Sequence, residues 1–165
     1  MQKNQAIRYG IGAGIATIGF YLLFYFIDKR LMFNPGIYWG SLALPLVAMV
    51  LACRQQARVQ DGRLSWKEGI QIAFVVYVVA MAIYYLFYYV LFAYMDPGLV
   101  SVQAEVMQAG MERAKAILGE RQAGAWEELN PEDLRVTPAK SFFAFSQSLI
   151  GGFLLSLLVG GFSKR

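Results

Sequence analysis

The sequence predicts an all-α fold: an integral membrane four-helix bundle with an external amphipathic helical segment between spans three and four. The 165 residues are 58% hydrophobic and only 16% charged, whereas charged residues make up about 25% of a typical soluble domain. Four stretches carry no charged residue, and each is close to or above the roughly 20 residues with which a helix crosses a bilayer. The third stretch also lacks the polar stripe that buried helices of soluble proteins usually carry. The four stretches are Tyr9–Ile27, Leu31–Cys53, Gly69–Met95 and Ser141–Phe162.

These stretches define a single membrane domain over residues 1–165. The first span follows the basic residues Lys3 and Arg8, as the apolar part of a signal peptide would. Its apolar run is longer than that of a signal peptide, and Asp28-Lys29-Arg30 follows it where a small-residue cleavage site would be needed, so we expect a retained helix. The predicted spans are about 9–27, 35–53, 67–95 and 138–162, and the external segment is 96–137.

Prolines and capping residues predict where the helices begin. An Asn, Asp or Thr directly before a proline can cap a helix, because its side chain accepts a bond from a free backbone N–H and the proline at the first helical position has none to satisfy. Ser65 and Glu68 have the spacing of a capping box at the start of span three. Within span two, Pro45 is expected to break the backbone hydrogen-bond ladder and kink the helix. The cap–proline pairs are Asn34-Pro35, Asp96-Pro97, Asn130-Pro131 and Thr137-Pro138.

The external segment is predicted to begin with an amphipathic helix over about 97–122, followed by an irregular stretch that Trp126 anchors at the membrane surface. Apolar residues recur in the helix at three- and four-residue spacing, which indicates one apolar face. That face could lie on lipid, on a protein partner or on a second copy of the chain, or the segment could be a solvated helical hairpin. We favour a protein partner, because interfacial helices usually have a basic polar side and this one is mixed to acidic. The residues predicted to face the partner are Val102, Val106, Met107, Met111 and Leu118.

Small residues recur at four-residue intervals in spans one and four. Helices in lipid associate by close approach of their backbones, which such stripes permit. The stripes predict that spans one and four pack closely on each other, or that one of them meets another subunit. The residues assigned to this packing are Gly10, Gly14, Ser148, Gly152, Ser156 and Gly160.

Six of the ten tyrosines lie in span three, most of them in its external half and level with Tyr21 of span one. A buried tyrosine hydroxyl needs a hydrogen-bond partner. The cluster therefore either lines an outward cavity that takes a ligand, such as a lipid headgroup or a quinone, or forms an aromatic belt with ordinary helix packing. The candidates for a ligand-facing role are Tyr21, Tyr84, Tyr85 and Tyr88.

The charges that flank the spans predict the orientation. The side that holds both termini and the loop between spans two and three has eight basic and two acidic residues, and the other side has seven basic and nine acidic residues. Because basic residues gather on the cytoplasmic side, we expect both termini to be cytoplasmic and the 96–137 segment to lie outside.

The sequence offers little catalytic chemistry. It has no histidine and one cysteine, which excludes the usual zinc sites, histidine-dependent nucleophilic catalysis and disulfide frameworks. No Asp, Glu, Lys, Arg or His lies inside a span, where proton-coupled transporters typically carry one. The net charge of +4 is too mild to indicate a nucleic acid partner. We therefore predict no enzyme, no catalytic residues, no metal site and no cofactor.

Two motifs frame span three: Gly62-Arg63-Leu64-Ser65-Trp66-Lys67-Glu68-Gly69 opens it and Tyr94-Met95-Asp96-Pro97 closes it. In these motifs, and in its overall layout, nearly the whole chain resembles a family of small bacterial membrane proteins known as domain of unknown function 4199. The resemblance implies four spans and a long external segment before the last, in a multi-pass protein of the bacterial inner membrane. It implies no activity.

These observations predict a non-catalytic integral membrane accessory or scaffold subunit, surrounded by membrane lipids, that binds a membrane protein partner or a second copy of itself. The alternative is a transporter-like protein that binds a small ligand or lipid in an outward aromatic cavity. A cavity among Tyr21, Tyr84 and Tyr88 would favour this alternative. A third possibility is a lipid-interacting or membrane-shaping protein.

Overall fold

The fold is helical throughout the part of the chain that the computed structural model describes, which comprises residues 2–61, 64–118 and 134–162. Within it, four segments are long and apolar enough to cross a membrane: Asn4–Ile27, Pro35–Val59, Trp66–Met95 and Pro138–Gly161. The predicted all-α, four-span fold is confirmed. The helices are α1 (Gln2–Ile27), α2 (Pro35–Ser41), α3 (Ala43–Val59), α4 (Trp66–Val90), α5 (Leu99–Leu118) and α7 (Pro138–Phe162), with a 3₁₀ turn η1 (Lys29–Phe33) and a π-helical turn η2 (Leu91–Met95).

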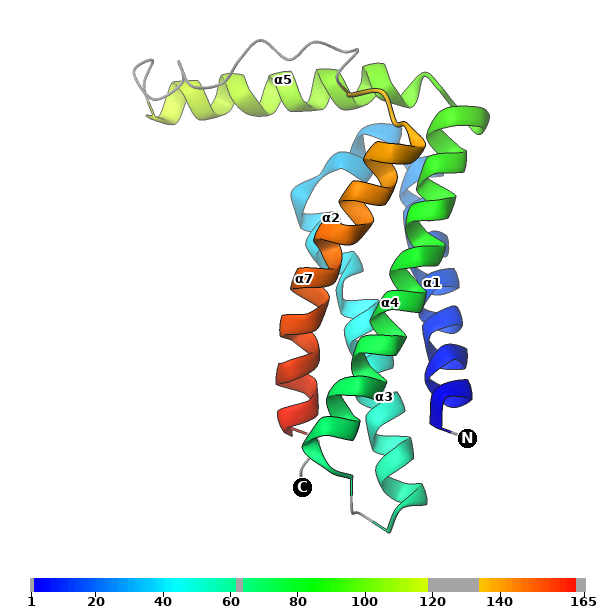
Figure 1. Cartoon of the computed structure of the whole chain (residues 1–165). Coiled ribbons are helices and arrows are strands. Elements are labelled where there is room, and N and C mark those ends of the chain that lie inside the picture. The colour runs from blue at the N-terminus through cyan, green and yellow to red at the C-terminus, as the bar shows by residue number, and fades with distance from the viewer. Residues whose placement is uncertain (1, 62–63, 119–133, 163–165) are drawn as a thin grey trace.

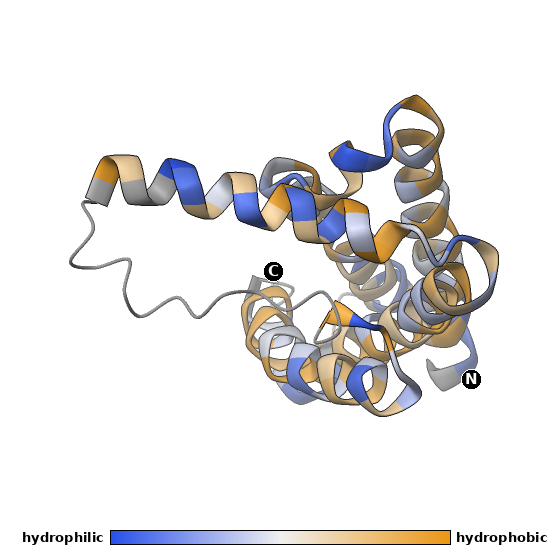
Figure 2. Ribbon diagram, turned by 90° about the horizontal axis from the view of Figure 1, so that it is seen from above, coloured by the Kyte–Doolittle hydropathy of each residue, from blue (hydrophilic) through white to orange (hydrophobic). Residues whose placement is uncertain are grey.

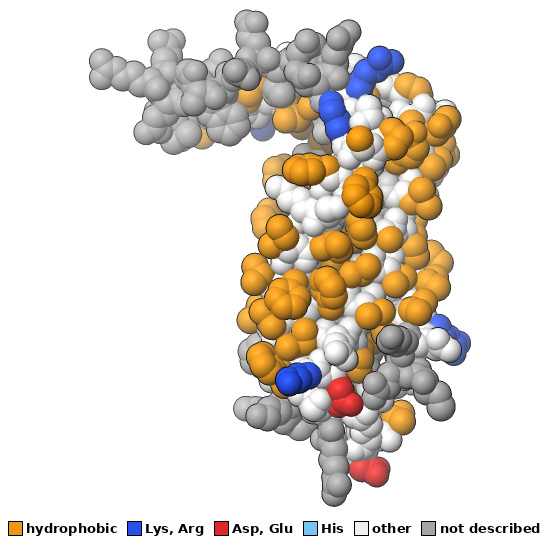
Figure 3. Space-filling view, viewed as in Figure 1, with side chains coloured by type: hydrophobic (Ala, Val, Ile, Leu, Met, Phe, Trp, Pro, Cys, Tyr) orange, Lys and Arg blue, Asp and Glu red, His pale blue; other side chains and the backbone are white. Residues whose placement is uncertain are grey.

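The spans lie side by side, and α5 runs crosswise over one end of the bundle (Figure 1). The start of α1, the end of α7 and the connection between α3 and α4 lie at the opposite end, which we call the terminal end. The end that carries α5 and η1 is called the α5 end. Apolar side chains cover the flank of the bundle, and the charged side chains gather at its two ends (Figure 3). This distribution is the one expected of a bundle that spans a membrane.

Helix α4 lies at the centre of the bundle and packs against α1, α3 and α7. Its buried residues recur at three- and four-residue spacing, which places them on one broad face of the helix. Around them lies the main hydrophobic core, to which α1 contributes Ala6 and Ala13, and α3 contributes Met49 and Cys53. The buried residues of α4 are Gly69, Ile72, Ala73, Val76, Tyr77, Ala80 and Met81.

Both small-residue stripes pack on α4, so the expectation that spans one and four pack on each other is wrong. A Cβ atom on Gly10 would lie 2.9 Å from the carbonyl oxygen of Val76, and one on Gly160 would lie 2.8 Å from the backbone nitrogen of Ile70. The physical reason is that a stripe of small residues dictates close approach but not the partner, and α4 stands between the two helices (Figure 1).

The remaining stripe residues follow the same arrangement. A Cβ on Gly14 would lie 2.9 Å from Cβ of Ile83, and one on Gly152 would lie 2.1 Å from the ring of Tyr77. Ser156 is fully buried, and its hydroxyl donates to the carbonyl of Gly152 at 2.7 Å. Ser148 is half-buried and bonds within its own helix. The two stripes thus fix the distances of α1 and α7 from α4.

Most predicted helix starts are confirmed by cap hydrogen bonds. The Asn34 side chain accepts from Gly36 N at 2.8 Å, and Thr137 accepts from Lys140 N at 3.2 Å. The capping box of Ser65 and Glu68 is present in both directions. The pair Asn130-Pro131 lies outside the described residues, as does Trp126.

Span two is broken, as predicted from Pro45. The break falls at Leu42, between α2 and α3. Pro45 has no N–H to give to the carbonyl four residues earlier, on Ser41, so the α-helical ladder is interrupted there. The helix then continues to Val59, beyond the predicted end near 53.

The amphipathic helix begins at Leu99, two residues later than predicted from Asp96-Pro97. Leu99 N bonds to Asp96 O at 3.1 Å and Val100 N to Pro97 O at 3.3 Å. These are bonds between residues three apart, so the chain makes a tight turn over 96–98 before the α-helical ladder starts.

The close contact of α1 with α4 makes a first prediction. Gly10→Leu is expected to lower the free energy of unfolding by at least about 1–3 kcal/mol, because the added side chain overpacks a backbone contact. Thermal unfolding in detergent, followed by tryptophan fluorescence, measures the loss. The control is Gly19→Leu in the same helix, where a Cβ meets nothing within 4 Å. Equal unfolding midpoints for the two variants would contradict the close approach.

Candidate ligand-binding site

A cavity of about 470 Å³ lies at the α5 end, and we call it the tyrosine cleft. Its lining includes all four tyrosines predicted to face a ligand, so a cavity among Tyr21, Tyr84 and Tyr88, which would favour the alternative function, is present. Whether they contact a ligand stays a prediction. The lining residues are Tyr21, Met32, Phe33, Pro35, Tyr38, Tyr84, Tyr85, Tyr88, Gln103, Met107 and Ala144.

Ring contacts hold the tyrosines in place. Tyr84 and Tyr88 lie one turn apart on α4, with ring centroids 6.0 Å apart, and the Tyr21 ring of α1 lies 5.1 Å from that of Tyr84. Tyr88 also stacks on Phe92 of the π-helical turn η2, at 4.2 Å. Such aromatic pairs each add about 0.5–1.5 kcal/mol beyond their burial. The wall of the cleft is therefore a connected aromatic cluster, not a set of freely rotating side chains.

One tyrosine hydroxyl is committed to a defined network. The hydroxyl of Ser41 donates to the carbonyl of Tyr38 at 2.7 Å. Its oxygen lies 3.1 Å from the hydroxyl of Tyr21. Since the Ser41 proton is already used, Tyr21 is the donor in this second bond. The network ties α1 to the broken span two beside the cleft.

A second hollow, of about 190 Å³, continues the cleft toward the start of α7. The two share four lining residues, Tyr85, Tyr88, Gln103 and Ala144. The second hollow adds three polar or basic residues and two apolar ones, from the start of α7 and the segment that leads into it. These added residues are Leu134, Arg135, Val136, Lys140 and Ser141. The combined space is thus apolar and aromatic on one side and basic on the other.

Two buried polar atoms in this space have no hydrogen-bond partner in the described chain. They are Oε1 of Gln103 on α5 and Oγ of Ser141 on α7. A third such atom, Oε1 of Gln60, lies far from the cleft near the end of α3. A buried polar atom without a partner costs about 1–3 kcal/mol, and native proteins satisfy nearly all such atoms. Both residues line the second hollow, which makes that hollow the candidate place for a molecule with hydrogen-bonding groups.

Helix α5 covers the cleft, and two ion pairs join η1 to α5 and to Asp96 just before it. Lys29 pairs with Asp96, which also accepts from the Tyr25 hydroxyl at 3.0 Å. Arg30 bonds to Glu105 at 3.0 Å, but both side chains are more than half exposed. The bond from Lys29 is the chief cause that holds the pKa of Asp96 below its ordinary value of 3.8, and the same bond raises the pKa of Lys29.

Buried apolar residues complete this attachment. Leu99 is fully buried and joins the second hydrophobic cluster with Tyr21, Met32, Leu91 and Phe92. The later part of α5 runs past the bundle (Figure 2). The first turns of α5 are therefore the anchored part of the helix, and they carry Gln103 over the cleft.

The residues predicted to face a protein partner take different positions. Met107 lines the cleft, which makes it a residue of the cavity, and it is 38% exposed. Val102, Val106 and Met111 are half-buried. The side chain of Leu118 lies outside the described residues.

The polar residues of the cleft were not predicted from the sequence. Gln103 stands four residues before Met107, which places both on one helix face. A polar residue on the apolar face of the external helix indicates a polar contact there, so Gln103 could have been identified from the sequence. Ser141, Arg135 and Lys140 gave no such signal, because only the fold brings the start of α7 beside α4. No group of three or more potential metal ligands occurs among the described residues.

A membrane-spanning helix bundle with a ligand-sized cleft beneath a crosswise helix is the class of protein that these features define. The chain belongs to the family described as "Protein of unknown function (DUF4199)", whose model matches residues 8–165. The membership expected from the motifs of span three is confirmed. No curated protein and no solved structure matches the chain.

The attachment of α5 makes a second prediction. Asp96→Asn is expected to speed hydrogen exchange in the first turns of α5 several-fold at neutral pH, because Lys29 loses its charged partner. Because the pKa of Asp96 is lowered, its contribution in the unmodified protein is complete above pH 3.8 and is lost as the pH falls below that value. Glu105→Gln is the control, since an exposed ion pair contributes little. Equal exchange in both variants would contradict the anchoring role of Asp96.

Proposed function

We propose that this protein binds an amphipathic molecule from the membrane in the tyrosine cleft, without catalysing a reaction on it. The observation that carries the proposal is the pair of unpartnered buried atoms, Gln103 Oε1 and Ser141 Oγ, whose residues both line the basic hollow that adjoins the aromatic cavity. The function predicted as the alternative from the sequence is thus better supported than a scaffold role alone.

The lining defines the chemistry of the ligand. An apolar chain suits the part of the cleft formed by Met32, Phe33 and Met107. A hydroxyl group would donate to Gln103, whose amide oxygen is an acceptor. An anionic group suits the side that carries Arg135 and Lys140. A single-chain lipid with a phosphate and hydroxyl groups combines these properties.

Lysophosphatidylglycerol is the probe for this proposal, which makes a third prediction. Gln103→Met should weaken its binding about three- to tenfold, because one hydrogen bond to the glycerol hydroxyls is lost. The same variant should leave the empty protein as stable as before or more stable, since an unsatisfied buried acceptor is removed. Titration in detergent with native mass spectrometry gives the affinity, and thermal unfolding gives the stability.

Two comparisons sharpen this experiment. Gln108→Met changes an exposed glutamine of the same helix and should alter neither quantity. Oleate has an anionic group but no hydroxyl, so Gln103→Met should not weaken it. Unchanged binding of lysophosphatidylglycerol to Gln103→Met, or equal losses for both probes, would refute the role of Gln103.

The accessory or scaffold role stands as a second candidate, and the far half of α5 supports it. Within the described chain, α5 packs mainly on η1, and Leu99 at its start also joins the second hydrophobic cluster. Ile117 is 82% exposed. An apolar group so far from the bundle would gain from a membrane protein partner or a second copy of the chain.

We further propose that the protein lies in the bacterial inner membrane with both termini in the cytoplasm. The support is the excess of basic residues at the terminal end, which predicts the cytoplasmic side. The α5 end and the tyrosine cleft would then face the outside.

Cysteine labelling tests this orientation and makes a fourth prediction. In a Cys53→Ala background, we replace the exposed Ser101 on α5 with cysteine. This cysteine should react in intact cells with a maleimide that crosses the outer membrane but not the inner membrane. A cysteine replacing the exposed Arg58 on α3 should react only after the inner membrane is opened. The reverse pattern would invert the proposed topology.

A further inference from the structure

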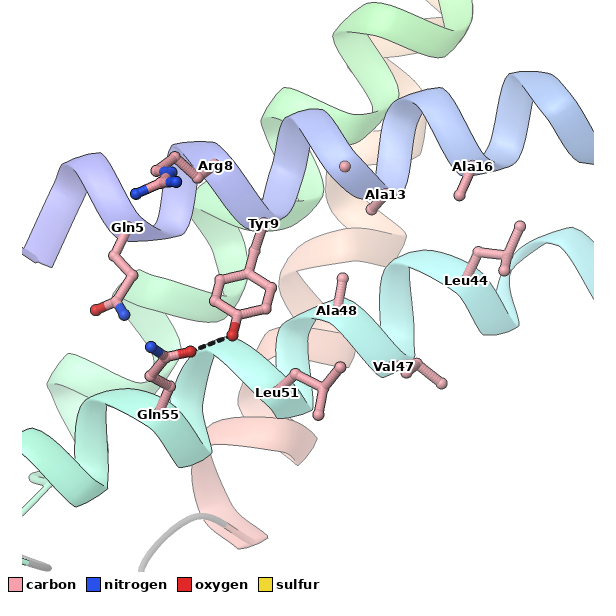
Figure 4. Close-up of a pocket in the computed structure, with 11 residues that line it drawn as sticks. Gln5, Arg8, Tyr9, Ala13, Ala16, Leu44, Val47, Ala48, Leu51 and Gln55 are labelled. Atoms are coloured by element: carbon pink, nitrogen blue, oxygen red, sulfur yellow. Dashed lines mark hydrogen bonds between the residues drawn. The ribbon is translucent and has the colours of Figure 1, made fainter.

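A second apolar groove lies between α1 and α3, away from the tyrosine cleft and toward the terminal end (Figure 4). Its volume is about 480 Å³. The groove exists because the facing residues are small: Gly12, Ala13 and Ala16 on α1 and Ala48 on α3. A Cβ on Gly12 would meet nothing within 4 Å. Gly12, Ala16, Val47 and Leu51 are exposed, so the groove opens sideways, toward the hydrocarbon of the bilayer.

Hydrogen-bond donors gather where the groove ends, near the start of α1. Gln5, Arg8, Tyr9 and Gln55 line this end. The Tyr9 hydroxyl donates to Oε1 of Gln55. This bond orients the Gln55 amide, and Figure 4 shows its NH₂ group turned toward the side chain of Gln5.

Arg8 makes this end of the groove positive. Its side chain is exposed and forms no ion pair with an acidic residue of the described chain. An arginine one turn inside a span extends its charged group to the membrane interface, where phosphates lie. The amide donors and the guanidinium together match the oxygens of a phosphate group.

We propose that this groove binds one anionic phospholipid, with an acyl chain along Gly12 and Ala16 and its phosphate at Arg8, Gln5 and Gln55. Two features favour a lipid over a packed helix. The polar end presents donors and a positive charge, which an anionic headgroup satisfies and the apolar surface of a helix does not. The opening faces the bilayer, so the acyl chain enters without any movement of the helices. The site is separate from the tyrosine cleft and does not depend on the proposed function.

The test uses phosphatidylglycerol and phosphatidylcholine, titrated into the delipidated full-length protein and followed by native mass spectrometry. Wild-type protein should bind one phosphatidylglycerol more tightly than phosphatidylcholine. Arg8→Gln should weaken phosphatidylglycerol about tenfold and remove the preference. Gly12→Leu should remove the site by filling the groove, and it should fold normally because its Cβ lies in open space.

Gly151→Leu is the matched control, since Gly151 is exposed on α7 with open space around its Cβ. It should bind phosphatidylglycerol as the wild-type protein does. Binding of lysophosphatidylglycerol in the tyrosine cleft should survive Gly12→Leu, which separates the two sites. Unchanged phosphatidylglycerol binding in Arg8→Gln and Gly12→Leu would overturn the proposal. So would a change from dimer to monomer in Gly12→Leu with the lipid retained, because the groove would then hold a helix of a second copy.

Discussion

The close approach of α1 and α7 to the backbone of α4 is the constraint on which the rest of this structure depends. In lipid, apolar side chains gain little by leaving their surroundings, so the helices are held by contacts that only small residues allow. Gly10 and Gly14 on one side and Gly152 and Gly160 on the other bring α4 within reach of both neighbours. Each of these four positions therefore affects the geometry of the whole bundle.

The central position of α4 explains where the tyrosine cleft forms. At the end where α4 carries small and aliphatic residues, its neighbours come close and the core is filled. Toward the α5 end, α4 carries the bulky rings of Tyr84, Tyr85 and Tyr88, which meet Tyr21 across the space between the helices. Large flat rings hold the helices apart without filling the gap completely. A cavity closed by α5 is the result.

Much of this arrangement was predictable from the sequence, because local rules govern it. The segregation of charges predicted the spans, and the caps at Asn34, Ser65 and Thr137 predicted where helices begin. The break near Pro45 follows from one missing N–H. The partner of each glycine stripe was not predictable, since close approach can be satisfied by any neighbouring helix. Likewise, the presence of Gln103 and Ser141 in one hollow depends on the tertiary placement of α5 and α7, which no spacing within the sequence encodes.

The π-helical turn at Leu91–Met95 determines the direction in which the chain leaves the bundle. Asp96 N bonds to Leu91 O at 2.8 Å, five residues back, so this turn contains one residue more than an α-helical turn. Each residue of an α-helix rotates the chain by about 100°. With one residue fewer, Asp96 would be rotated by about 100° from its place beside Lys29, and the chain would leave the bundle in another direction. The one extra residue in this turn thus determines whether α5 lies over the tyrosine cleft.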